Sequence, residues 1–417
     1  MTAIVFVSLA IWLVLLFGRG FFWLARERDD QTDLSSRPSD GPQRQRAGAS
    51  REPGPTSNSA SASEWVPGLP RTVSEVARDD TVRKWPAVVA VVPARNEADV
   101  IATSIGSLLA QDYPGALRVV LVDDQSSDGT ASIARALGDG RLEVLEGAVH
   151  PSGWTGKLFA VAQGVERAGD EPDYLLLTDA DIAHAPDNLR RLVSRAEEGN
   201  TVLVSLMAKL HTETFAERFL IPAFVFFFDM LYPFAWVNNP RYRMAAAAGG
   251  CMLVRREALR CAGGIDAIRS EIIDDCALGR LMKTQGPIWL GLTERAASLR
   301  PYPRIADIRQ MVARSAYAQL GYSPVTLLGT VLGMALLYLV PLAGLAFGEL
   351  SALLGALTWA LMTVSFQPML RFYGRSPLWG VAMPLIGAFY TAFTIDSAVQ
   401  HWRGRGGMWK GRAQAIS

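Results

Sequence analysis

The sequence predicts an α/β domain with a mainly parallel sheet, bounded by apolar segments at both ends of the chain. Three observations support this prediction. Strand-like apolar runs alternate with helical patterns between residues 85 and 320, which is typical of a parallel sheet covered by helices. Residues 26–84 are polar and rich in Ser, Pro and Gly. Long apolar stretches occupy residues 1–25 and 321–400.

The first 25 residues predict a membrane anchor. The run from Ala3 to Gly18 is uncharged, and apolar residues resume after Arg19, so the segment is long enough for one crossing. No basic region precedes it and no small-residue cleavage site follows it, which argues against a secretory signal peptide. Arg19, Arg26 and Arg28 follow the apolar run, and basic residues favour the cytoplasmic side. We therefore expect the chain to enter the cytoplasm after the anchor.

Residues 26–84 predict a flexible linker between this anchor and the α/β domain. A stretch such as SSRPSDGPQRQRAGASREPGPTSNSASAS cannot bury enough apolar surface to offset the entropy of ordering it. Across the whole chain, 41 basic and 40 acidic residues leave a net charge of +1. So small a charge argues against a nucleic-acid partner, and no feature indicates a protein partner.

Three apolar segments, 325–347, 350–370 and 376–395, predict membrane helices at the C-terminal end. Each is long enough to cross a hydrocarbon core of ~30 Å at ~1.5 Å per residue. If the anchor and all three segments crossed, the basic tail 401–417 would lie outside, whereas its basic residues favour the inside. One re-entrant or interfacial segment would remove this conflict, and the sequence does not indicate which one it is.

The α/β region is predicted from unbroken apolar runs, which read as buried strands, and from apolar residues at three- and four-residue spacing, which read as helices. The predicted strands are AVVAVVP (87–93), LRVVLVDD (117–124), RLEVLE (141–146), DYLLLTDAD (173–181) and TVLVSLMA (201–208). The predicted helices are EADVIATSIGSLLAQ (97–111), DGTASIARAL (128–137), GKLFAVAQGVERAG (156–169) and PDNLRRLVSRAEE (186–198).

Polar and acidic groups follow three of these strands. The first strand runs into PARNE (93–97), the second into VDDQSSDGT (122–130) and the fourth into TDAD (178–181). Ligands of parallel α/β sheets bind outside the carboxyl ends of the strands, so these groups are expected to meet at one edge. Asp179 and Asp181 then predict a divalent cation, Mg²⁺ or Mn²⁺, shared with substrate phosphates. The competing interpretation is a solvated turn.

Five motifs together resemble the family 2 glycosyltransferases with the GT-A fold: PARNE, VDDQSSDGT, GWTGKLFAVAQG, TDAD and EIIDDCALG, in this order within residues 85–320. The membrane-flanked layout is similar, more narrowly, to the hopene-associated glycosyltransferases. The resemblance implies a Rossmann-like GT-A domain. It also implies an inverting, metal-dependent enzyme in the cytoplasmic membrane that transfers a sugar from a UDP-sugar to a lipid acceptor, with a hopanoid as the specific suggestion.

The resemblance also assigns roles to residues. Those implied to bind the nucleotide-sugar donor are Pro93, Arg95, Asn96, Glu97, Asp123, Asp124, Lys157, Asp179 and Arg314. Asp124 would accept from the uracil ring, Lys157 would lie near the pyrophosphate or sugar, and Asp181 would bind the metal. Alternative interpretations are a helix cap for Asn96 and Glu97, a turn acid for Asp123 and a solvated lysine for Lys157.

Asp274 and Asp275 match the acidic pair of the family, in which the second residue is the general base. An acceptor hydroxyl is a poor nucleophile until a base removes its proton. The alternative for this pair is favourable placement of acids at a helix N-terminus. The chain lacks the Gln-x-x-Arg-Trp motif of processive synthases, because Arg314 lies four residues after Gln310 and Ser315 follows it.

The absence of the Gln-x-x-Arg-Trp motif weakens one alternative function, that of a polysaccharide synthase. The retained acids weaken a second alternative, that of a catalytically silent scaffold that binds a nucleotide sugar. The apolar stretch 219–237 lies inside the α/β region and carries Asp229 and two prolines, which argues against a spanning helix. It is expected to be an interfacial element that holds the site against the bilayer. The alternative is ordinary core.

Overall fold

The computed structural model describes residues 1–30, 85–406, 408–409 and 412–413. Its centre is an eight-stranded sheet with the strand order β3-β2-β1-β4-β7-β6-β8-β5. The strands are β1 (Val88–Ala94), β2 (Leu117–Asp123), β3 (Leu142–Glu146), β4 (Tyr174–Thr178), β5 (Ile182–His184), β6 (Leu203–Lys209), β7 (Cys251–Arg255) and β8 (Ile288–Ser298). Only β5 and β7 pair antiparallel to their neighbours within this sheet. The predicted mainly parallel sheet is confirmed.

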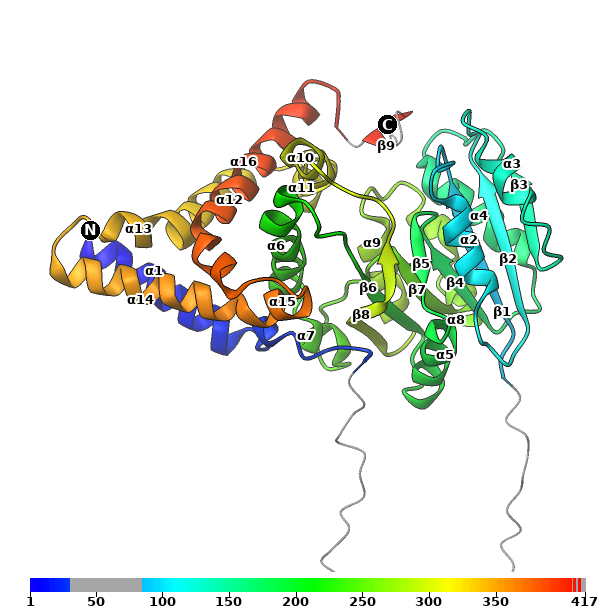
Figure 1. Ribbon diagram of the computed structural model, residues 1–417, viewed down its shortest axis with the longest axis horizontal. Helices are drawn as coiled ribbons and strands as arrows, with labels where there is room; N and C mark the ends of the chain where they lie inside the picture. The colour runs from blue at the N-terminus through cyan, green and yellow to red at the C-terminus, as the bar shows by residue number, and fades with distance from the viewer. Residues whose placement is uncertain (31–84, 407, 410–411, 414–417) are drawn as a thin grey trace, which may run out of the picture. The chain divides into compact units, whose positions relative to one another are not determined.

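Helices cover both faces of the sheet, as the alternating pattern predicted (Figure 1). The helices that follow the predicted positions are α2 (Ile101–Leu109), α3 (Thr130–Arg135), α4 (Gly156–Ala168) and α5 (Asn188–Glu198). Alternate residues of β1 enter two separate hydrophobic clusters, Val88 and Ala90 with α2 and α5, and Val89 and Val91 with α4. Every residue of β1 is therefore buried, which explains its unbroken apolar run.

Helix α6 (Phe215–Leu231) joins the sheet domain to the apolar helices at the C-terminal end. A capping box between Thr214 and Glu217 begins it, and the helix continues through Pro222. Its rings pack against those helices: Phe227 lies 4.8 Å from Tyr390. After a turn, α7 (Phe234–Asn238) follows. Of the two interpretations of residues 219–237, buried core describes α6 well, because most of its apolar residues lie in the main hydrophobic cluster.

The C-terminal elements are α10 (Ile305–Ala313), α11 (Ala316–Gln319), α12 (Pro324–Met334), a π-helical turn η4 (Ala335–Leu339), α13 (Val340–Gly344), α14 (Glu349–Ser365), α15 (Gln367–Phe372), a 3₁₀ helix η5 (Pro377–Ala382) and α16 (Met383–Trp402). Three stretches within the described residues are long and apolar enough to cross a membrane: Pro324–Gly344, Glu349–Phe372 and Pro377–Trp402. They match the three predicted segments.

The membrane anchor expected over residues 1–25 stays a prediction, but its helix is shorter than the sequence predicted. Helix α1 covers Thr2–Gly18 and ends there, because Gly20 and Phe21 adopt positive φ angles of 65° and 52°. At ~1.5 Å per residue, its 17 residues extend only about 25 Å. A short 3₁₀ helix, η1 (Phe22–Leu24), follows. Any membrane crossing by α1 is therefore shorter than the sequence predicted.

The linker prediction is wrong for residues 26–30 and lies outside the described residues for 31–84. Arg28 pairs with Leu292 of β8, and the Asp29 backbone nitrogen donates to the Leu292 oxygen at 3.0 Å. The buried Asp29 carboxylate accepts from Thr293 at 2.8 Å and pairs with Arg295 at 3.3 Å. Of the predicted tail 401–417, the first two residues belong to α16, and residues 407, 410–411 and 414–417 lie outside the described part.

Candidate active site

The loops that follow β1 and β2 bond to each other and form one wall of the candidate site. Arg95 donates to the backbone oxygen of Asp124 and pairs with its carboxylate at 3.4 Å. Asn96 has a left-handed backbone with φ of 51°, and its side-chain oxygen accepts from the Ser127 nitrogen at 2.9 Å. The N-cap of α2 is Val100, without a side-chain cap bond, so the capping interpretation of Asn96 and Glu97 is wrong.

Pro93 and Asp123 lie at the ends of the same two strands, where Pro93 is the register partner of Val122. One carboxylate oxygen of Asp123 accepts from the Ser126 nitrogen at 3.3 Å. The other is buried and has no hydrogen-bond partner among the described residues. Asp123 therefore has the position of a turn acid and keeps one acceptor atom for a further group.

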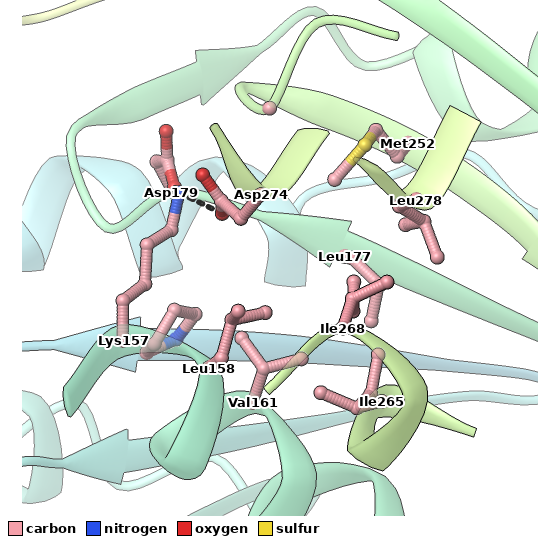
Figure 2. A pocket seen from close by; sticks show the side chains of 12 residues that line it. Lys157, Leu158, Val161, Leu177, Asp179, Met252, Ile265, Ile268, Asp274 and Leu278 are labelled. Atoms are coloured by element: carbon pink, nitrogen blue, oxygen red, sulfur yellow. Dashed lines mark ion pairs between the residues drawn. The ribbon is translucent and has the colours of Figure 1, made fainter. Parts of the chain in front are cut away.

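A second part of the site is the lysine cluster, which consists of Lys157, Asp179 and Asp274. The Lys157 ammonium lies 2.8 Å from Asp179 and 2.9 Å from Asp274, and Figure 2 shows it between the two carboxylates. Lys157 is held at the start of α4, whose N-cap Thr155 accepts from the Leu158 nitrogen. Burial alone would lower the pKa of Lys157, but the two carboxylates outweigh it and raise the pKa. The solvated-lysine interpretation is wrong.

Asp275 lies beside this cluster in the first turn of α9 (Asp274–Lys283). Its carboxylate accepts from the Gly249 nitrogen at 3.0 Å and from the Cys276 nitrogen at 2.7 Å. Burial, followed by the negative charge of Asp274, raises the pKa of Asp275 to about 6. A carboxylate that loses its proton near pH 6 is well suited to act as a base at neutral pH.

The third part is the arginine cluster, which consists of Arg300, Glu97 and Asp181. Arg300 Nε donates to Asp181 at 2.7 Å, and its Nη2 donates to both oxygens of Glu97 at 2.7 and 2.8 Å. Burial lowers the pKa of Arg300, but Asp181 and Glu97 outweigh burial and raise it. Sequence reasoning missed Arg300. It follows β8, which runs parallel to β6, so a basic residue after that strand was the available signal.

Arg314, a predicted donor-binding residue, and His184, which follows Asp181 and lies in β5, are outside these clusters. Arg314 is exposed at the end of α10, and the ion pairs found among the described residues do not include it. It acts electrostatically on Tyr302, whose pKa it helps to lower against burial. His184 is buried, bonds to Thr178 and Asn188, and burial lowers its pKa to about 4. His184 is thus a neutral core residue whose ring nitrogens bond to Thr178 and Asn188.

Among the described residues, no group of three or more His, Cys, Asp and Glu side chains is arranged to hold a metal by itself. A shared site needs fewer protein ligands, because Mg²⁺ is commonly bound by one or two carboxylates together with substrate phosphates. Asp181 and Glu97 converge on one guanidinium within 2.8 Å, so they present oxygen atoms to a common cation. The residues therefore fit a divalent ion that is completed by a nucleotide diphosphate.

A cavity of about 20 Å³ lies behind the lysine cluster (Figure 2). Apart from the charged groups at its mouth, its walls are apolar, with Leu158, Val161, Ile265 and Ile268 among them. This volume is about that of one water molecule, and an apolar cavity is normally dry. The cavity therefore belongs to the packing of α4 and α9 and is too small for a sugar.

Residues 89–263 match the model of a family described as Glycosyl transferase family 2. The chain is also 26% identical over 352 residues to 4,4'-diaponeurosporenoate glycosyltransferase of Staphylococcus aureus strain USA300, covering 79% of this chain and 89% of the relative. With the protein of the same name from strain MRSA252, identity is 27% and the alignment covers 48% of this chain. That alignment spans about half of the relative, 52% of its length.

Two solved structures have a chain course that partly matches this chain. A mannosyltransferase from Pyrobaculum calidifontis, in complex with GDP-Man and Mn²⁺, is 20% identical, with a TM-score of 0.47 over 78% of this chain and 89% of that one. Glucosyl-3-phosphoglycerate synthase from Mycobacterium tuberculosis, in complex with Mn²⁺, UDP and phosphoglyceric acid, is 20% identical, with a TM-score of 0.37 over 57% and 78%.

Proposed function

The chain is a family 2 glycosyltransferase with the GT-A fold, and from this premise we propose that it transfers a sugar from a UDP-sugar to a membrane lipid with inversion at the anomeric carbon. One observation carries the proposal: Asp275, whose pKa is raised to about 6, lies beside acids that are already bridged by Lys157. A base and a cation are thereby positioned at the carboxyl edge of the sheet, where such folds bind their ligands.

In the proposed reaction, Asp275 removes the proton of the acceptor hydroxyl while the hydroxyl oxygen attacks the anomeric carbon of the donor sugar. The bond from that carbon to the leaving phosphate breaks, and UDP departs on the opposite face. The Gly249 and Cys276 nitrogens, which donate to Asp275, hold its carboxylate in place. Lys157 and Arg300 place positive charge near the developing charge of the leaving diphosphate, which is the electrostatic contribution expected of such groups.

We propose that Asp181 holds Mg²⁺ or Mn²⁺ together with the diphosphate. When bound, such an ion neutralises the leaving phosphate. Arg300 Nε donates a hydrogen bond to the Asp181 carboxylate at 2.7 Å. In the proposal, the guanidinium leaves this carboxylate when the cation binds. Glu97 and Asp124 lie on the neighbouring wall and are proposed to contact the nucleoside. The other residues proposed to bind the nucleotide-sugar donor are Pro93, Arg95, Asn96, Asp123 and Asp179. Arg314 is proposed only as a charge that approaches the diphosphate after a local movement.

The proposed acceptor is an apolar isoprenoid lipid with one polar terminus, and the narrower proposal is a hopanoid. Three stretches are long and apolar enough to cross a membrane, and α6 packs the sheet domain against them. The similar Staphylococcus aureus protein is named for an isoprenoid-type acceptor, 4,4'-diaponeurosporenoate. We place the enzyme in the cytoplasmic membrane as a multi-pass protein whose catalytic domain faces the cytoplasm, on the basis of the Arg residues after α1.

The test compares lipids from the source organism after deletion of the gene and complementation with wild type or Asp275→Asn. Mass spectrometry of the extracts is expected to show a glycosylated lipid that wild type restores and the variant does not. A polymer in the wild-type membranes, in place of a glycolipid, would support the polysaccharide synthase. Identical lipids and polymers in all strains, with UDP still bound by the purified protein, would support the silent scaffold.

A further inference from the structure

We propose that a cleft along η5 holds the apolar chain of the acceptor and that the segment Pro377–Trp402 re-enters the membrane to form it. This inference rests on the lipid acceptor of the proposed function. The cleft has a volume of about 520 Å³ and is lined by Ser376, Leu378, Trp379, Val381 and Ala382. It is a shallow hollow, open to its surroundings, and the surface that lines it is mostly apolar.

The first step concerns where the segment begins. α15, which precedes it, ends against the catalytic sheet, because the Phe372 ring lies 5.1 Å from the Lys209 ammonium at the end of β6. η5 then runs back along α14, antiparallel to it. Gln367 donates to the Pro377 oxygen at 3.1 Å, and Trp359, two turns earlier in α14, donates to the Val381 oxygen at 2.9 Å. These bonds satisfy carbonyl groups that an apolar environment would otherwise leave unpaired.

The second step concerns where the segment ends. A Cβ added to Gly387 would lie 2.5 Å from the Tyr338 ring, so the start of α16 meets the far half of Pro324–Gly344. Further along, Ala398 clusters with Leu327, at the near end of that stretch. α16 thus runs antiparallel to α12 and returns towards α10 and α11 (Figure 1). Both ends of Pro377–Trp402 therefore lie on the catalytic side.

The third step links the cleft to the catalytic residues. Trp379 lies 5.5 Å from Phe215 and 5.9 Å from Phe219, which form the first turns of α6. In the same turn, the buried Glu217 accepts from the Tyr302 nitrogen at 2.6 Å. Tyr302 is two residues from Arg300, which contacts Asp181. The aromatic wall of the cleft is thus connected through α6 to the segment that carries Arg300. This connection is the reason to propose the acceptor, and not bulk lipid, as the occupant.

A topological experiment tests the re-entrant course. In a Cys261→Ser background, which removes the exposed thiol, Arg375→Cys and Arg403→Cys are probed separately in intact cells and in lysates with a membrane-impermeant thiol reagent. Both cysteines are expected to react only after lysis. Reaction of Arg403→Cys alone in intact cells would mean that the segment crosses the membrane, and it would overturn the proposal.

A binding experiment tests the occupant. Full-length protein in nanodiscs is irradiated with a diazirine analogue of geranylgeraniol, and cross-linked peptides are identified by mass spectrometry. Label is expected at residues 215–219 and 376–382, and it should fall with excess geranylgeraniol. Trp379→Ala, and Ala382→Phe, which fills the cleft without removing a contact, are expected to reduce this label at least about fivefold, as for loss of a central aromatic anchor.

Leu353→Ala, on an exposed face of α14, serves as the matched control and should leave the label unchanged. Label that spreads over α12 and α14 and does not fall with excess geranylgeraniol would contradict the proposed cleft. Labelling of Ala382→Phe at the wild-type level would also contradict it. UDP titration of the same samples separates the two proposals. If the wild type binds UDP but excess geranylgeraniol does not reduce the label, the cleft proposal fails and the proposed function stands. If the wild type does not bind UDP, the proposed function fails and this inference fails with it.

Discussion

The lysine cluster and the arginine cluster lie at the same edge of the sheet, yet they differ in which partner is more exposed. The Lys157 side chain is 17% exposed, less than Asp179 at 33% and Asp274 at 23%. The Arg300 side chain is 33% exposed, more than Glu97 at 11% and Asp181 at 16%. A cation that is less exposed than its acids is a fixed counter-charge, whereas a guanidinium that is more exposed than its two acids can withdraw into solvent. The lysine cluster is therefore expected to be permanent and the arginine cluster exchangeable.

The largest expected effect comes from the proposed base, Asp275, which lies beside the lysine cluster. Asp275→Asn keeps the shape and removes the proton-accepting charge, so transfer should fall about 10²–10⁴-fold. UDP affinity should change less than about threefold, roughly 0.7 kcal/mol. Transfer rates and UDP titrations on the same preparations check both values. Asp274→Asn is the comparison and should harm turnover less. Normal turnover of Asp275→Asn would remove it as the base, and lost UDP binding would make it a donor-site or folding residue.

Lys157→Met tests whether the lysine cluster is permanent. The variant leaves Asp179 and Asp274 as neighbouring, partly buried carboxylates without a cation. Removing one partner of a fully buried pair costs about 3–5 kcal/mol, and the partial exposure here reduces the expected loss to about 2 kcal/mol. Thermal unfolding in detergent measures the loss, and the double variant Lys157→Met/Asp179→Asn should recover part of it. An unchanged melting temperature would show that the cluster contributes no stability.

Arg300→Gln tests whether the arginine cluster is exchangeable. Without the competing guanidinium, Glu97 and Asp181 should bind Mn²⁺ more tightly in the absence of nucleotide, by about threefold to tenfold, or about 0.7–1.4 kcal/mol. Calorimetric titration with Mn²⁺ alone measures this change. Arg314→Gln is the matched control, because Arg314 belongs to neither cluster, and should bind Mn²⁺ as wild type does. Weaker Mn²⁺ binding by Arg300→Gln would mean that Arg300 supports the metal site and does not compete with it.

The metal assignment has its own test in Asp181→Ala. UDP affinity of the wild type should depend on Mn²⁺, and that dependence should disappear in the variant, because the carboxylate shared by the cation and Arg300 is lost. Calorimetry with and without Mn²⁺ gives the four affinities that are needed. Asp123→Ala offers a control acid at the same edge and should keep the metal dependence. Equal metal dependence of UDP binding in wild type and Asp181→Ala would refute the assignment.

The smallest expected effect is a shift of the pH profile. The proposed base, Asp275, can accept a proton only when it is deprotonated, and its pKa is raised to about 6. kcat/KM should therefore be nearly constant from pH 7 to 8 and should fall below pH 6, by up to tenfold per unit. Because the charge of Asp274 contributes to the raised pKa, Asp274→Asn should move this acidic limb to lower pH. If the acidic limb of the Asp274→Asn profile stays at the wild-type pH, burial alone sets the pKa of Asp275.

The strand-end motifs could be placed together from the sequence because their geometry follows from chain direction. Parallel strands end at one edge, so the acids after β2 and β4 were expected to meet the PARNE segment there. Lys157 was predicted by resemblance to lie near the donor diphosphate, and the structure places it within 3 Å of Asp179 and Asp274. Its partners could not be predicted, since α4 and α9 are brought together only by packing.

By itself, the sequence determined the alternation of strands and helices, the family motifs and the apolar character of the ends, because these depend on local patterns of burial. Tertiary structure decided which distant groups neutralise each other. Arg300 pairs with Asp181, 119 residues away, and Arg28 pairs with a strand that begins at Ile288. Tertiary structure also decided that α16 runs back towards α10 and α11. Hydropathy could not predict this direction, because it records only whether a segment is apolar. The direction of such a segment is set by its packing, as in the contact between Gly387 and Tyr338.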